Sequence, residues 1–77
     1  MNNLSARIAI LEATDLNESA RLCLQDAQRC IARSECGEDF PSTSKVSGLP
    51  TSWIEAAASW VFRAGQHQFG FATPAGW

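Results

Sequence analysis

Hydrophobic positions in the first half of the chain follow helical spacing in two separate stretches. Leu4, Ile8 and Leu11 recur every three or four residues, the spacing of an amphipathic helix. A second stripe, widened by Leu24 and Ile31, comprises Leu16, Ala20, Cys23, Ala27 and Cys30. At about 100° per residue from Leu4, the first stripe is centred near about 10° and the second near about 120–140°. One straight helix could not bury both stripes against a single neighbour.

The two stripes meet at residues 14–17, a run of mostly poor helix formers. Asp15 and Glu18 resemble a capping box with Asp in place of Ser or Thr. Gly37 is placed to end the second helix at C′. We therefore predict helices at about 4–13 and 16–35, with one kinked helix as the alternative.

Residues 37–51 read as a connecting loop, because glycine, proline, serine and threonine dominate there. Pro41 and Pro50 exclude a continuous helix. Fifteen residues are long for a loop in a small domain. We expect it to be loosest at 42–47 and partly packed through Phe40, Val46 and Leu49.

The most strongly patterned segment is a predicted helix at 52–64. Ser52 and Glu55 form a capping box at its start, and Gly65 fits a C′ position at its end. One apolar stripe contains Trp53, Ala57, Trp60 and Ala64, and a second, about 100° away, contains Ile54, Ala58 and Val61, with Phe62 beyond it. A helix that is apolar over more than half of its circumference needs cover on two sides.

The remaining residues, 66–77, alternate apolar side chains at Phe69 and Phe71. We expect an aromatic C-terminal tail, extended over the helices, that turns through Pro74 and Gly76. The sequence has three Trp and four Phe, and all except Phe40 lie after residue 52.

These aromatic residues form either the core of a small bundle or, in part, an interface. Two apolar stripes, with too little chain to cover both, favour the interface. The predicted partner-binding residues are Trp53, Trp60, Val61, Phe62, Phe69, Phe71 and Trp77. Three consecutive alanines at 56–58 would let a second copy approach closely, so a homodimer is expected.

Length and charge narrow the function. Seventy-seven residues make one small domain, 1–77, whose core is marginal unless it is stapled or paired. A formal net charge of −2 argues against nucleic acid or an anionic membrane as the main partner. The first twenty residues lack the continuous apolar region of a secretory signal, and no apolar run reaches the roughly 20 residues of a membrane span. We expect a cytosolic protein with reduced thiols.

Catalytic and metal-binding groups are weakly indicated. The spacing of Cys23, Cys30, Cys36 and His67 matches no zinc knuckle, and no nucleophile signature surrounds any of these cysteines. Cys23 and Cys30 fall on an apolar helix face, whereas Cys36 is expected to be exposed. Three acidic residues near the loop, Glu35, Glu38 and Asp39, read as a solvated surface. We therefore expect no catalytic residue, metal or cofactor.

Three arginines, Arg21, Arg29 and Arg33, fall on the polar face of the second predicted helix. A DNA reader could use such a face, but Glu18 and Asp26 interrupt it.

The sequence predicts an all-α bundle of two to three helices that acts as a non-enzymatic interaction or regulatory module. An inhibitor or adaptor, comparable in size to phage or plasmid accessory proteins, is the expected type. A small dimeric DNA-binding regulator and a Cys-dependent metal or redox protein are the alternatives.

Overall fold

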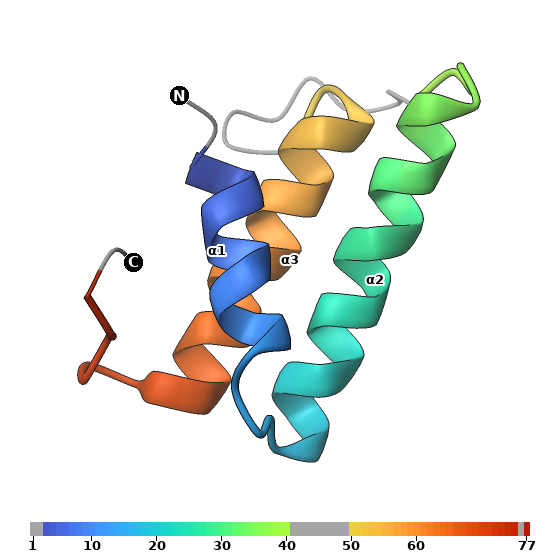
Figure 1. Cartoon of the computed structure of the whole chain (residues 1–77). Helices are drawn as coiled ribbons and strands as arrows, with labels where there is room; N and C mark the ends of the chain where they lie inside the picture. Colours follow the sequence, from blue (N-terminus) through green and yellow to red (C-terminus); the bar gives the residue numbers. More distant parts are fainter. Residues whose placement is uncertain (1–2, 41–49, 76) are drawn as a thin grey trace.

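Three helices side by side make up the fold: α1 (Asn3–Glu12), α2 (Glu18–Glu35) and α3 (Trp53–Phe69) (Figure 1). The structure, a computed structural model, describes residues 3–40, 50–75 and 77. Within that part of the chain no strand is present, so the predicted small all-α bundle is confirmed. The predicted loop contacts of Val46 and Leu49, and its loosest part at 42–47, lie outside the described residues. Among the described helices, none combines the length and the apolar character that crossing a membrane requires.

Small side chains line the contact between α2 and α3. Ala20, Ala27, Ala57 and Ala64 are fully buried, and Val61 and Leu11 are the largest side chains that are fully buried. The two helices run antiparallel, because Asn17 before α2 bonds to the last turn of α3 and Trp53 at the start of α3 reaches Glu38 after α2. Residues 13–17 separate α1 from α2, so two helices replace the single kinked alternative.

The start of α2 differs from its prediction. Asn17, and not Asp15, is the N-cap, and its side-chain oxygen accepts a hydrogen bond from Ala20 N–H at 2.8 Å. Asn17 also donates from Nδ2 to His67 O at 2.9 Å and from its backbone N–H to Gln68 Oε1 at 2.8 Å. An asparagine can accept at the cap and donate to α3 together, which an aspartate carboxylate could not do.

The end of α2 is as predicted. Gly37 has φ +78°, the left-handed region in which glycine carries no Cβ penalty. Its N–H donates to Ser34 O, and Glu38 N–H donates to Arg33 O, both at 3.1 Å. These two bonds form a Schellman motif.

Ser52 is the N-cap of α3, as predicted, but the Glu55 carboxylate bonds to Thr51 and not to the N–H of the N-cap as in a capping box. Ser52 Oγ accepts from Glu55 N–H at 3.2 Å. The Glu55 carboxylate accepts from the hydroxyl and the backbone N–H of Thr51, one residue before the cap. The hydroxyl bond first, and the backbone bond second, lower the pKa of Glu55.

The predicted end of α3 is wrong. The helix continues through Gly65 to Phe69 and ends at Gly70, which has φ +60°. Gly65 is buried beneath the ring of Trp77, and a Cβ at Gly65 would lie 2.1 Å from Trp77 Cζ2. The glycine therefore allows a close approach of Trp77 and does not stop the helix.

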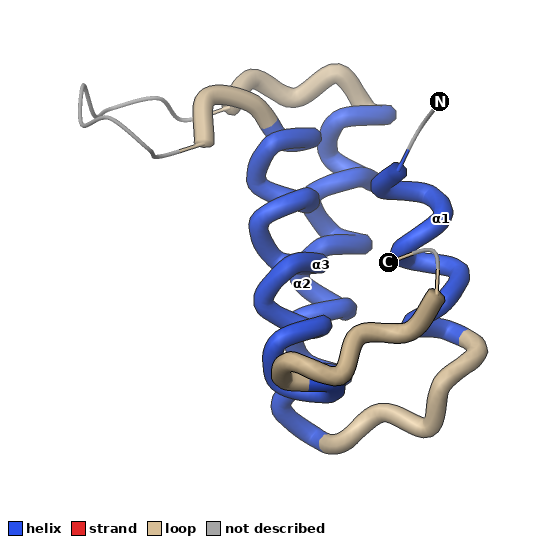
Figure 2. Tube along the Cα trace, turned by 90° about the vertical axis from the view of Figure 1, so that its left-hand side faces the viewer, coloured by secondary structure: helices blue, strands red, loops and turns tan. Residues whose placement is uncertain are grey.

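The tail is shorter than predicted, since residues 66–69 are helical. Phe69 packs edge-to-face on Trp77 with ring centroids 5.5 Å apart, while Phe71 is fully exposed. From Gly70 the chain turns back and brings the C-terminal end beside α1 (Figure 2). There Arg7 Nε donates to Trp77 O at 2.9 Å, and the guanidinium lies 5.3 Å from the centroid of the Trp77 ring.

Candidate functional site

The two apolar stripes of α3 have different environments. In the first stripe, Ala57 and Ala64 are fully buried against α2, and Trp53 and Trp60 are half-buried at the edge of that contact. The second stripe is divided: Val61 is fully buried, but Ile54 is 47% exposed and Ala58 is exposed. Phe62 beyond it is 52% exposed. The core therefore includes the alanines of the first stripe and Val61, whereas the outer edge of the second stripe is exposed to solvent.

The seven predicted partner-binding residues are separated into three places. Val61 lies in the core, so its side chain is not accessible to a partner and does not belong to a binding surface. Trp53 and Trp60 line a hollow between α2 and α3. Phe62, Phe71 and Trp77 line a second hollow beside the tail, where Phe69 packs on Trp77.

The tail hollow lies between α1, α3 and residues 70–75 and 77, and has a volume of about 320 Å³. Phe62 and Phe71 are its exposed aromatic walls, and Trp77 is held by Gly65 and Arg7. Its lining residues are Arg7, Phe62, Gly65, Gln66, Gly70, Phe71, Thr73 and Trp77. The sequence did not identify Arg7 as a residue that lines this hollow and holds Trp77, because the contact joins residues 70 positions apart.

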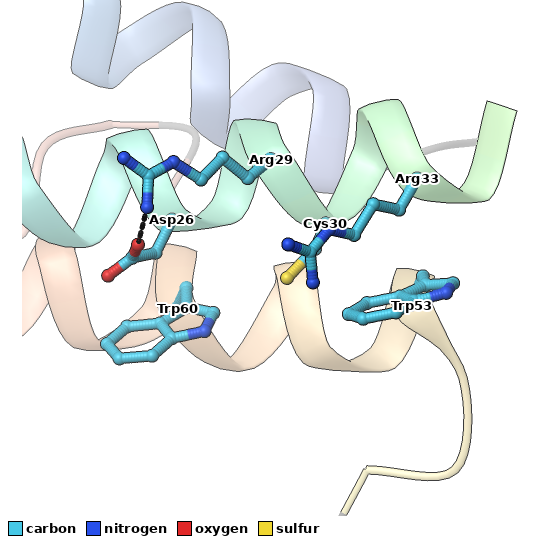
Figure 3. A pocket seen from close by; sticks show the side chains of 6 residues that line it. All are labelled: Asp26, Arg29, Cys30, Arg33, Trp53 and Trp60. Atoms are coloured by element: carbon cyan, nitrogen blue, oxygen red, sulfur yellow. Dashed lines mark ion pairs between the residues drawn. The ribbon is translucent and has the colours of Figure 1, made fainter. Parts of the chain in front are cut away.

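The α2–α3 hollow has a volume of about 250 Å³ and is lined by Asp26, Arg29, Cys30, Arg33, Trp53 and Trp60 (Figure 3). Three contacts hold Trp53 in place. Its Nε1–H donates to Glu38 O at 3.0 Å, Phe40 packs edge-to-face at 4.9 Å, and the Arg33 guanidinium lies 5.0 Å from the ring centroid. Trp60 carries a guanidinium over its ring as well, that of Arg63 at 5.2 Å.

The three arginines that were considered for DNA binding contact other groups of the protein in this structure. Arg29 pairs with Asp26 at 3.5 Å, Arg33 lies over Trp53, and Arg21 donates to the carbonyl of Leu16 at 3.5 Å. Because Asp26 pairs with Arg29, the cationic face is interrupted as the sequence indicated. Arg29 and Arg33 instead contribute positive charge to the α2–α3 hollow.

The cysteines lie where the helical pattern places them. Cys23 and Cys30 are buried and Cys36 is exposed, as predicted. Burial raises the pKa of the Cys30 thiol, Arg33 acts in the opposite direction, and Asp26 adds to the increase. The Cys30 thiol therefore stays protonated at neutral pH and contributes an apolar surface. Among residues 3–40, 50–75 and 77, no three His, Cys, Asp or Glu side chains are grouped so that they could hold a metal ion.

Comparison of the chain with protein-family models, with curated protein sequences and with solved structures finds no match, so its function is inferred from its own residues.

Proposed function

We propose that the protein is a non-enzymatic cytosolic interaction module, of inhibitor or adaptor type, that pairs with a second copy of itself through the tail hollow. The observation that carries this proposal is the exposure of two phenylalanines, Phe62 and Phe71, around one hollow. Each such side chain contributes about 1.5–3 kcal/mol when it is fully removed from water. Two on one face favour a covered surface over a solvated one.

A second copy is the proposed occupant of this face, because the face presents both a protruding side chain and a hollow. Phe71 protrudes beside the hollow that it helps to line. A two-fold axis would insert Phe71 of each copy into the hollow of the other, which is the requirement of an isologous interface. Ala58, exposed one turn before Phe62, adds little bulk between two α3 helices.

A stable dimer interface must extend beyond the tail hollow. A standard interface covers about 800 Å² per partner, against a total accessible surface of 5417 Å² here. The surface that lines the tail hollow is smaller than this interface area per partner. The exposed row along α3, with Ile54 and Ala58 beside Phe62, extends the same surface.

The non-enzymatic part of the proposal is supported by the state of the candidate groups. A nucleophilic thiol needs a lowered pKa, and the pKa of Cys30 is raised. His67, the single histidine of the sequence, is exposed in the last turn of α3.

Sedimentation equilibrium over a wide concentration range tests the pairing. The wild-type chain is expected to form a dimer, and the double variant F62S/F71S is expected to dissociate at least tenfold more readily, because two buried aromatic contacts are lost. The control is L22S on α2, since Leu22 is 54% exposed and lies outside the tail hollow. A wild-type monomer of 8.4 kDa at millimolar concentration, or equal weakening by L22S, would contradict the proposal. Circular dichroism is used to check that each variant is folded.

A further inference from the structure

We infer that the α2–α3 hollow is a binding site for a carboxylate joined to a flat apolar body, such as an aromatic carboxylic acid. The inference does not depend on pairing through the tail hollow, because none of the residues that the structure describes lines both hollows. It rests on the walls, the hydrogen-bond donors and the charge of this hollow.

The walls are flat and apolar. Trp53 and Trp60 stand two turns apart on the same side of α3, and the Cys30 thiol of α2 lies between them (Figure 3). The hydrogen bond to Glu38 O and the edge-to-face packing of Phe40 fix the orientation of the Trp53 ring before any ligand arrives. A preformed aromatic wall lowers the cost of ordering the site on binding.

The polar groups at the edge are mainly donors. The guanidinium of Arg33 reaches over the gap between Cys30 and Trp53, and the indole nitrogen of Trp60 lies on the ring edge that faces Cys30 (Figure 3). Arg29 stands one turn before Arg33. The acceptor at this edge, the Asp26 carboxylate, is paired with Arg29. A ligand that supplies acceptor oxygens therefore matches these groups.

The charge of the lining selects an anion over a cation. Two arginines against one aspartate give the lining a net charge of +1, from +2 and −1, in a chain whose formal charge is −2. Two tryptophans beside an aspartate could also suggest a cage for a cation. However, Arg33 and Arg63 already lie over the two rings, so a further cation would meet like charges.

The size of the hollow and its walls restrict the ligand further. A bare inorganic anion would satisfy the guanidiniums but would add no apolar contact to the walls formed by Trp53, Trp60 and Cys30. The volume of about 250 Å³ is below the roughly 300–1,000 Å³ of pockets that hold drug-sized ligands. A carboxylate with one or two fused rings meets both conditions.

Titration of the ¹⁵N-labelled full chain with 2-naphthoate tests the site, followed through the three indole N–H resonances. Saturable shifts are expected for Trp60 and Trp53, while Trp77, which lies in the tail hollow, serves as the internal control. The neutral isostere 2-naphthamide should bind at least about tenfold more weakly, the scale of one hydrogen bond to a charged group. Inorganic phosphate alone should bind more weakly as well.

Three arginine variants locate the binding. R33Q and R29Q should each weaken the binding of 2-naphthoate about tenfold. R29Q is included because R33Q also removes the contact of Arg33 with the Trp53 ring. R21Q is the matched control, because Arg21 is on the same helix but does not line the hollow. The inference is overturned if no saturable shift occurs, if all three indoles shift alike, if 2-naphthamide binds as well as 2-naphthoate, or if R21Q weakens binding as much as R33Q and R29Q.

Discussion

Gly65 has the most restricted environment of the described glycines. It lies within α3, where glycine costs about 1 kcal/mol relative to alanine. The ring of Trp77 occupies the space that any side chain at this position would need. The cost in helix propensity is thus offset by the packing of Trp77 on the helix backbone.

Substitution of Gly65 by alanine should therefore release Trp77. In G65A the added Cβ would lie 2.1 Å from Trp77 Cζ2, so the ring must leave. We expect a lower free energy of unfolding, measured by urea denaturation, and a Trp77 indole resonance moved toward its solvent-exposed position.

The control for G65A is the same change in a W77A background. Without the ring, the alanine only improves helix propensity, and G65A should then raise the free energy of unfolding by about 0.5–1 kcal/mol. A destabilising effect of equal size in both backgrounds would show that the Gly65–Trp77 contact is not its cause.

At the scale of elements, one residue joins the start of α2 to the end of α3. Asn17 caps α2 through its side-chain oxygen and bonds to α3 through its side-chain nitrogen and its backbone N–H. Gln68 returns a bond from Nε2 to Asp15 O at 3.3 Å. The junction is therefore set by helix ends that are about 50 residues apart in the chain.

Two substitutions of Asn17 separate its functions. N17D keeps the capping acceptor and loses the bond to His67 O, whereas N17A loses both. Both variants should have a lower free energy of unfolding, measured by thermal unfolding, because both lose the bond to His67 O. N17A should lose about 1 kcal/mol more than N17D, because it also loses the cap.

S52A provides the comparison, since Ser52 caps α3 without a tertiary bond from its side chain. It should lose about 1 kcal/mol. If N17D is as unstable as N17A, the side-chain cap of α2 contributes nothing.

At the scale of the whole molecule, α1 is held less extensively than the α2–α3 pair. Its anchors are Leu11, which is fully buried, and Arg7, which bonds to Trp77. The tail therefore acts as a tether between α1 and α3.

Native-state hydrogen exchange should show this difference. Amides of α1 are expected to open at a lower free energy than those of α2 and α3, because local stability follows the extent of packing. W77A should accelerate exchange in α1 further and leave the middle of α2 unchanged. L22A, which shortens a side chain that is 54% exposed and lines neither hollow, is the control. Equal protection of α1 and α2 in the wild-type chain would contradict the expectation.

The sequence by itself determined the features that depend on neighbouring residues. The three helices follow from apolar spacing, the Ser52 cap from a hydroxyl three residues before Glu55, and the end of α2 from Gly37. Each rests on hydrogen bonds that span about three to five residues, so local pattern suffices. Among the described residues, the large exposed hydrophobic side chains are Ile54, Phe62 and Phe71 in the C-terminal part of the chain and Leu22 on α2.

Only the tertiary structure decided the rest. Asn17 displaces Asp15 as the cap because Gln68 and His67 hold it, and Gly65 continues the helix because Trp77 lies on it. The division of α3 into a buried edge with Val61 and an open edge with Phe62 depends on where α2 packs. The contacts of Asn17 and Gly65 join residues about 12 to 51 positions apart, and helical spacing is equally compatible with either choice until the helices are brought together.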